Sequence, residues 1–220
     1  WAQSITYHRD SLGDASYAGC ISVALGGDAS VATSGFWASL TMATTLKLPM
    51  LFYIEDNDLG ISVRGDMQTP GGDIARNLAS FTNLFVRNGS GTEPHEAAGL
   101  LQEAVAHVRS GAGPALVRLT VPRLCSHSGP DNQKGYRTDD EIAADLARDP
   151  LPKLHDYLVP ALMSAVEWAE LEAEVARDIA AGLEEARARA IPNPATIAQY
   201  VMADESPDVA EAMGGLTRAE

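Results

Sequence analysis

Two short apolar runs joined by one helical segment set the strongest limit on the fold. Residues 20–25 (CISVAL) are mostly apolar and stop at two glycines, which is typical of a buried strand. A helical pattern follows over residues 34–47, and residues 50–54 (MLFYI) form a second apolar run after Pro49. A strand, a helix and a strand within so few residues predict a right-handed βαβ unit. We therefore expect an α/β fold, with a parallel sheet flanked by helices.

Two further segments extend this pattern. Residues 93–110 place apolar side chains on one helical face, with Thr92 as a candidate N-cap and Gly111 just beyond the helix end. Residues 115–121 (ALVRLTV) predict another strand. A long irregular segment, residues 122–137, follows, and loops of this length inside a compact domain are usually functional or mobile.

We expect three parts along the chain. Residues 1–150 would form the α/β domain, which includes a short helix begun by a capping box of Thr138 and Glu141. Residues 151–203 would form a C-terminal helical segment of the same domain. Residues 204–220 are acidic and lack periodicity, so we expect a loosely ordered tail or linker there.

Composition argues against several classes of protein. The formal net charge of −14 disfavours nucleic-acid binding, which needs clustered Lys and Arg. No apolar run is long enough to cross a bilayer. Cys20 and Cys125 stand apart from any metal-ligand spacing, which favours a reducing compartment. We expect a cytoplasmic protein of a bacterium, with the mitochondrial matrix as the alternative setting.

Two polar residues follow the two strands of the βαβ unit. Asp28 comes just after the first strand and Asn57 just after the second. Because the carboxyl ends of parallel strands meet at one edge of the sheet, we expect these side chains to lie close together. A carboxylate and an amide oxygen suit Mg2+, which proteins usually hold together with substrate phosphates. A main-chain carbonyl just after Asn57 would complete the ligand set.

The small residues around Asp28 suit a phosphate group. Residues 26–37 (GGDASVATSGFW) leave a strand and open a helix, so free backbone N–H groups would face a bound anion. Asp28 would not repel the bound anion if the Asp28 carboxylate held a cation that also bound the anion. Asp and Asn after strands are also ordinary turn residues, so spacing alone leaves a metal site and plain turns both open.

These motifs together resemble a known family. Residues 27–29 (GDA) followed by residues 56–57 (DN) are similar to the thiamine diphosphate signature, Gly-Asp-Gly and then Asn-Asn after a little under thirty residues. The segments FWASLTMATTLKLPMLFYIEDNDLGISV, GPALVRLTVPRLCSHSGPD and GYRTDDEI resemble the alpha subunit of the decarboxylating component of 2-oxo acid dehydrogenase complexes. That group includes the pyruvate, branched-chain 2-oxo acid and acetoin enzymes. The resemblance covers residues 20–200 approximately and implies the thiamine diphosphate-binding fold.

The resemblance implies a set of cofactor-binding residues. Its members are Gly27, Asp28, Ala29, Ser30, Asn57, Leu59, Ile61 and His127. Asp28, Asn57 and the main-chain carbonyl of Leu59 would bind Mg2+. The small residues beside Asp28 would lie along the diphosphate, and Ile61 would touch the rings of thiamine diphosphate.

The irregular segment carries the implied catalytic residue. His127 matches the histidine that the family places over the reacting thiazolium ring, although taken alone it would more simply be a loop histidine with no task. Ser128 matches a regulatory phosphorylation position of the mitochondrial enzymes, and Asp131, Tyr136 and Arg137 match contacts that order this loop.

The implied activity is decarboxylation of a 2-oxo acid with transfer of the acyl group to a lipoyl group. The resemblance implies a beta subunit or beta domain that completes the active site, and a lipoyl acyltransferase component. It also implies an α2β2 assembly or an equivalent dimer of fused chains. The family has a further N-terminal stretch before the position of residue 1, so we expect this chain to be part of a longer polypeptide or of a fused one.

Two departures from the signature leave alternatives open. Ala29 replaces a glycine, which would cost energy if a positive φ were needed there, and Asp56 replaces an asparagine and adds a charge. A non-catalytic scaffold or regulatory relative with a weakened cofactor site is one alternative, and another thiamine-dependent carboligase is a second. A generic nucleotide-binding domain would carry a GxGxxG or Walker-type turn, and neither occurs.

Overall fold

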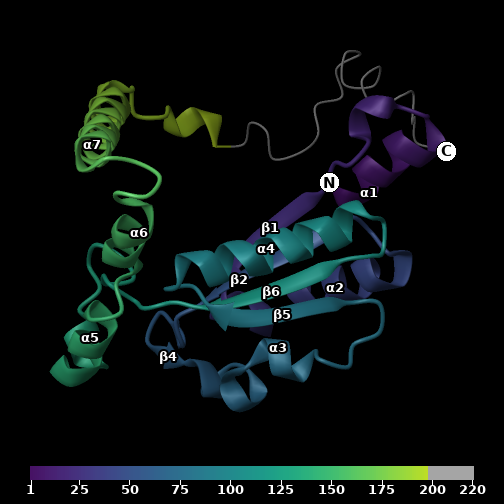
Figure 1. Ribbon diagram of the computed structural model, residues 1–220, viewed down its shortest axis with the longest axis horizontal. Coiled ribbons are helices and arrows are strands. Elements are labelled where there is room, and N and C mark those ends of the chain that lie inside the picture. Colours follow the sequence, from purple (N-terminus) through teal and green to yellow (C-terminus); the bar gives the residue numbers. More distant parts are fainter. Residues whose placement is uncertain (198–220) are drawn as a thin grey trace. The chain divides into compact units, whose positions relative to one another are not determined.

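Figure 1 shows the computed structural model of the chain, which describes residues 1–197. The chain falls into two compact units, Trp1–Ala165 and a second unit that begins at Val166. The predicted loose tail, residues 204–220, lies outside the described residues. The first unit contains the sheet and every residue of the candidate site, so the description concentrates on it.

A four-stranded parallel sheet forms the centre of the first unit. Its strands are β1 (Ser22–Gly27), β2 (Met50–Asp56), β5 (Phe85–Ser90) and β6 (Ala115–Thr120), in the spatial order β1-β2-β6-β5. All three neighbouring pairs are parallel. The α/β fold expected from the sequence is therefore confirmed.

The strands differ from the sequence-based ones in several bounds: β2 ends two residues later than predicted and β6 one residue earlier. The first strand lies two residues later than the apolar run, because the backbones of Gly26 and Gly27 pair with β2 although these residues have no side chains to bury. Strand β5 is not predicted by the sequence pattern of residues 85–90, so the expectation for this segment was wrong. The segment FVRNGS lacks the apolar alternation of a typical strand. Within the described sheet β5 is an edge strand that pairs only with β6, and edge strands need less apolar burial.

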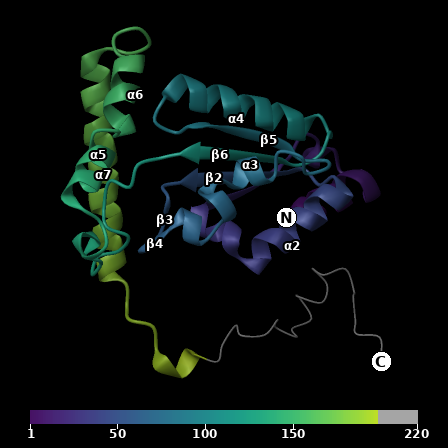
Figure 2. The same cartoon turned by 90° about the horizontal axis from the view of Figure 1, so that it is seen from below.

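Helices cover both faces of the sheet, and Figure 2 shows α4 on one side of the strands and α2 on the other. Helix α4 (Pro94–Arg109) buries Ala104 and Val108 in one core cluster. Helices α2 (Ser34–Leu46) and α3 (Ile74–Asn77) belong to the core on the opposite face. The strand residues of that second cluster are Phe52, Ile54 and Leu116. Apolar residues of the strands therefore alternate between two packed layers.

The ends of α4 test two predictions. Gly111 has φ +78 just after the helix, in the left-handed region that favours glycine, so the predicted stop is confirmed. The predicted N-cap was wrong by one residue, because Glu93 occupies that position. The Thr92 hydroxyl instead lies 2.9 Å from the Ser90 hydroxyl at the end of β5.

The described residues contain further helices and short strands besides these elements. They are α1 (Ala2–Thr6), β3 (Leu59–Gly60), β4 (Val63–Arg64), α5 (Asp139–Leu146), α6 (Pro150–Leu158) and, in the second unit, α7 (Ala165–Ala188). The capping box of Thr138 and Glu141 at the start of α5 is confirmed. The segment 122–137 is irregular except for one short 3-10 turn. No helix among residues 1–197 combines the length and apolar character needed to span a membrane.

Candidate functional site

The structure brings Asp28 and Asn57 to the same edge of the sheet. Gly27 is the register partner of Glu55, so β1 and β2 end side by side. Asp28 follows β1 directly as the first residue of a 3-10 turn, Asp28–Ala32, and Asn57 follows β2 directly. The register of β1 and β2 therefore places Asp28 and Asn57 on neighbouring strand ends.

Asp28 is a buried carboxylate with an unsatisfied oxygen. The residue is 7% exposed, and its Oδ2 atom has no hydrogen-bond partner among the described residues. Burial raises the pKa of Asp28 above its ordinary value, and the negative charges of Asp56 and Asp58 add to that rise. A buried carboxylate oxygen that lacks a donor is a position that a cation fits.

A tight turn after β2 sets the position of Asn57. The Asn57 Oδ1 atom accepts a hydrogen bond from the Leu59 N–H at 3.1 Å, which leaves the second lone pair of this oxygen for another partner. Asp58 has φ +63, and its carboxylate accepts from the Gly65 N–H at 3.2 Å. The β3–β4 ribbon is thus fixed directly behind the turn.

The predicted metal ligands contain only one carboxylate. Within residues 1–197, no group of three or more His, Cys, Asp or Glu residues is placed to hold a metal ion. Asp28, the Asn57 amide and the Leu59 carbonyl would therefore need phosphate oxygens to complete the coordination of Mg2+. The binding of Mg2+ by these residues stays a prediction.

The small residues after β1 form a short 3-10 turn rather than the start of the helix itself. The Ser30 hydroxyl donates to the Gly27 carbonyl at 2.6 Å, and Thr33 then caps α2. Ala29 is not among the residues with positive φ, so the alanine adds no backbone strain. Its methyl group instead faces Gly60, where an added Cβ would lie 2.7 Å from it.

Ile61 is held in an unusual backbone conformation. Its φ is +57, which is rare for a β-branched residue, and its side chain is 56% exposed. The main-chain carbonyl of Ile61 accepts a hydrogen bond from the buried guanidinium of Arg123. Such strain persists only where surrounding contacts impose it, and it is most often found at functional sites.

The same arginine orders the segment that carries His127. Oδ2 of Asp131 accepts hydrogen bonds from Arg123 Nη2 at 3.2 Å, from the Tyr136 hydroxyl at 2.6 Å and from the His127 N–H at 2.8 Å. The Tyr136 hydrogen bond is the main reason that the pKa of Asp131 is lowered, and the His127 N–H adds to it. The backbone of His127 is thus fixed, while its side chain is exposed.

Arg137 closes the other end of this segment. Its guanidinium pairs with Asp145 of α5 at 2.5 Å and donates to the Arg123 carbonyl at 3.3 Å. Asp131, Tyr136 and Arg137 therefore make the kind of ordering contacts that the sequence led us to expect. Ser128 is exposed on the same segment, and its phosphorylation stays a prediction.

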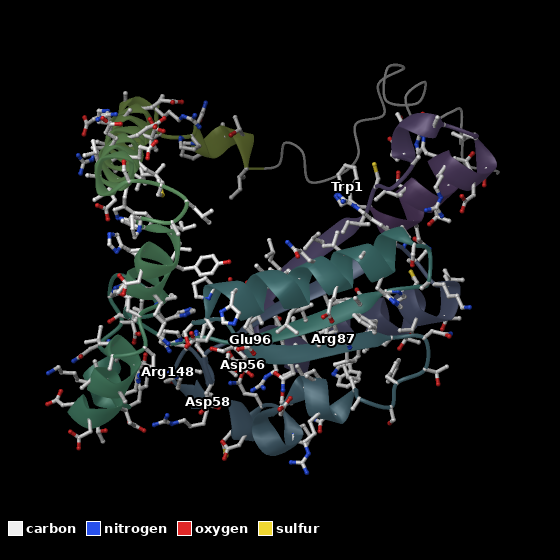
Figure 3. The ribbon with its side chains drawn as sticks, viewed as in Figure 1. Trp1, Asp56, Asp58, Arg87, Glu96 and Arg148 are labelled. Atoms are coloured by element: carbon white, nitrogen blue, oxygen red, sulfur yellow. The ribbon has the colours of Figure 1, made fainter. Side chains whose placement is uncertain are left out.

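A cavity of about 460 Å3 lies beside the Asp56–Leu59 turn. Figure 3 shows Asp56, Asp58 and Arg148, which line it, at this end of the sheet. Its other charged lining residues are Arg64, Arg118, Arg137, Glu141 and Asp145. These charged side chains come together because the carboxyl ends of β2 and β6 lie beside α5 there.

Comparison with known proteins identifies the family. A family described as "Dehydrogenase E1 component" matches residues 15–195. The chain belongs to the dehydrogenase E1 component family. This confirms the resemblance inferred from the sequence, and the family depends on thiamine diphosphate.

Several characterised relatives of this E1-family chain are named as alpha subunits. The chain is 28% identical to "3-methyl-2-oxobutanoate dehydrogenase subunit alpha" of Mycobacterium tuberculosis, over 63% of this chain and 37% of the relative. It is 27% identical to "Pyruvate dehydrogenase E1 component subunit alpha" of Porphyra purpurea, over 81% and 52%. It is 30% identical to "2-oxoisovalerate dehydrogenase subunit alpha" of Bacillus subtilis, over 60% and 40%. The chain thus spans about half of these relatives or less.

Sequence reasoning missed two arginines of this E1-family site. Arg118 lies in β6, and Arg123 lies three residues after the end of that strand. Both side chains are largely buried. The signal was present in the run ALVRLTVPR, because an arginine in a buried strand needs an acidic or carbonyl partner. The partners themselves lie far away in the sequence and could not be named from it.

Proposed function

We propose that this chain is the alpha part of a thiamine diphosphate-dependent 2-oxo acid dehydrogenase. It would decarboxylate a 2-oxo acid and pass the acyl group to a lipoyl group. The single observation that carries this proposal is the unsatisfied, buried Oδ2 atom of Asp28 next to Asn57 at the ends of β1 and β2. The family match and the names of the relatives support the same class of reaction.

The chain's own residues would hold the cofactor through its metal. Asp28, the Asn57 amide oxygen and the Leu59 carbonyl would bind Mg2+, which would in turn bridge to the diphosphate. Gly27, Ala29 and Ser30 would lie along that diphosphate. The orphaned oxygen of Asp28 supports this assignment, because a cation there would satisfy it and would offset its repulsion from Asp56.

The remaining site residues would act on the reacting end of the cofactor. When bound, thiamine diphosphate would supply the electron sink that loss of CO2 from a 2-oxo acid requires. His127 would give or take a proton at its imidazole ring during the reaction, because an imidazole carries both a donor and an acceptor nitrogen. Ile61 would pack against the cofactor rings, with its backbone held by Arg123.

Other chains would complete the active enzyme. A beta subunit or beta domain would supply the remaining part of the active site, in an α2β2 assembly or an equivalent dimer of fused chains. A lipoyl acyltransferase component would receive the acyl group. The names "subunit alpha" of the bacterial relatives support a partner subunit of this kind. The cytoplasmic setting expected from the sequence stays a prediction.

The scaffold alternative is not favoured. It depended on a cofactor site weakened by Ala29, but Ala29 has no positive φ, and its methyl group packs beside Gly60. A thiamine-dependent carboligase is disfavoured by the family match, which covers the segment containing His127.

The test is CO2 release by the assembled enzyme. The chain is combined with its beta partner, thiamine diphosphate, Mg2+ and an artificial electron acceptor, and pyruvate is compared with branched-chain 2-oxo acids. We expect CO2 release with at least one acid and none when Asp28 is replaced by Asn. Absence of CO2 release with every acid would contradict the proposal.

A further inference from the structure

A buried ion pair lies directly behind the turn that carries Asn57. Asp56 ends β2, and Arg118 comes from the neighbouring strand β6. Arg118 Nε donates to Asp56 Oδ2 at 2.5 Å, and the two side chains are 11% and 6% exposed. Charged groups this deeply buried persist only when they are paired and hydrogen-bonded.

The Asp56 carboxylate holds both the guanidinium and the turn. Its Oδ1 atom accepts a hydrogen bond from the Asp58 N–H at 2.9 Å. This bond closes a turn around Asn57, whose own side chain then accepts from the Leu59 N–H at 3.1 Å. The direction in which Asn57 points is therefore determined by the placement of Asp56.

Arg118 is itself held from several other elements. Its Nη1 atom donates to Asp73 at 3.1 Å and to Asn88 of β5 at 3.1 Å, and its Nη2 atom donates to the Gly72 carbonyl at 3.4 Å. Asp73 also caps α3. These contacts fix the guanidinium at the end of the sheet, so it offers Asp56 a rigid partner.

The pair explains why this chain carries a carboxylate at position 56. In the thiamine diphosphate signature that the chain resembles, this position is a neutral asparagine. Here the charge of Asp56 acts on the nearby buried carboxylate of Asp28, and Arg118 neutralises it. An amide at position 56 would turn either a weaker acceptor or an N–H group toward the guanidinium. Asp56 and Arg118 thus form a matched pair.

We propose that Arg118 is a positioning residue, which orients and neutralises Asp56 so that Asn57 and Asp28 can hold the metal of the cofactor. The inference rests on the proposed function, since it concerns the same site. It adds a residue that is not among the predicted metal ligands and that acts through Asp56 and the Asp56–Asp58 turn.

A double-mutant cycle tests the inference. The full chain, assembled with its beta partner, is prepared as R118M, D56N and D56N/R118M. Binding of thiamine diphosphate is titrated by calorimetry at a series of Mg2+ concentrations, and thermal unfolding is measured without cofactor. R87M is the matched control, because Arg87 lies on the adjacent strand β5 and pairs with the exposed Glu103 at 2.7 Å.

We expect R118M to weaken the apparent affinity for Mg2+ by about 10- to 100-fold, as loss of a partner behind a metal ligand usually does. The double variant should return to within about threefold of the parent, because it removes both charges together. The same recovery should appear in the melting temperature without cofactor. R87M should leave Mg2+ affinity unchanged.

The outcomes separate this inference from the proposed function. If the parent assembly shows no Mg2+-dependent binding of thiamine diphosphate, the proposed function fails and the inference fails with it. If the parent binds but the two single substitutions are additive, or R118M binds like the parent, only the inference is overturned. If R118M lowers the melting temperature but not the Mg2+ affinity, Arg118 is merely structural and the inference is wrong.

Discussion

At the scale of single residues, Asp28 is the side chain whose environment agrees least with a purely structural role. One of its oxygens is buried without a donor, and two further acidic residues raise its pKa. A turn that needed only a hydrogen-bond acceptor would leave this oxygen facing solvent or an N–H group. We therefore expect this placement to destabilise the chain without cofactor, and we propose that a bound cation offsets the cost.

This residue yields the first prediction. Replacing Asp28 by Asn removes the repulsion from Asp56 and Asp58, so it should stabilise the chain without cofactor. Each kcal/mol of added unfolding free energy should raise the melting temperature by about 2–4 °C. The same variant should lose the thermal stabilisation that thiamine diphosphate and Mg2+ give to the parent assembly. Differential scanning calorimetry with and without both ligands measures the two effects. A D28N variant that is still stabilised by the ligands would contradict the assignment.

Single residues also show how far the sequence could predict the site. Asp28 and Asn57 were predictable because each directly follows a recognisable strand, and parallel strands end at one edge. Arg118 and Arg123 were not, because their partners Asp56 and Ile61 lie 62 residues away in each case. Sequence patterns give the direction of a strand, but not which buried arginine reaches which carboxylate.

At the scale of elements, the irregular segment 122–137 is ordered by side chains rather than by backbone pairing. Arg123 connects Asp131 and Tyr136 of this segment to the carbonyl of Ile61. The two predicted cofactor contacts, Ile61 and His127, therefore depend on one guanidinium. A change at Arg123 should affect both at once.

The second prediction follows from this network. R123M leaves the Asp131 carboxylate without its positively charged partner. Breaking a buried ion pair costs about 3–5 kcal/mol of unfolding free energy. R148M is the control, because Arg148 is 47% exposed and its pair with Asp145 should contribute about 1 kcal/mol or less. Urea unfolding of both variants measures the difference. Equal destabilisation by the two substitutions would show that Arg123 has no special role.

The elements themselves were predicted unevenly. The helices of residues 34–47 and 93–110 were recognisable from their periodicity, and α2 and α4 match them closely. Strand β5 was missed because Arg87, Asn88 and Gly89 give no strand pattern, and only pairing with β6 makes this segment a strand. Local sequence does not encode an edge strand that is defined by its neighbour.

At the scale of the whole molecule, the matched part of this chain corresponds to only 37–52% of the length of its relatives. The site described within residues 1–165 contains the predicted metal ligands and the loop residues, but the proposed reaction also needs groups from a partner. Activity is therefore a property that we assign to the assembly and not to this chain alone.

The third prediction concerns that assembly. The chain alone, with thiamine diphosphate, Mg2+ and a 2-oxo acid, should release no CO2 above the level of a D28N control. Adding its beta partner should raise CO2 release in proportion until the two chains are equimolar. Light scattering of the same samples gives the stoichiometry. Full activity of the isolated chain would show that no partner is needed.

The register of β1 against β2 has a consequence for how this protein can vary. Gly27 pairs with Glu55, so the distance between Asp28 and Asn57 depends on the number of residues in each of the two strands. Inserting or deleting one residue within Met50–Asp56 would turn Asn57 to the opposite face of the sheet. The length of this strand is therefore more constrained than the identity of its side chains, and variants of this protein should tolerate substitutions in β2 far better than insertions or deletions.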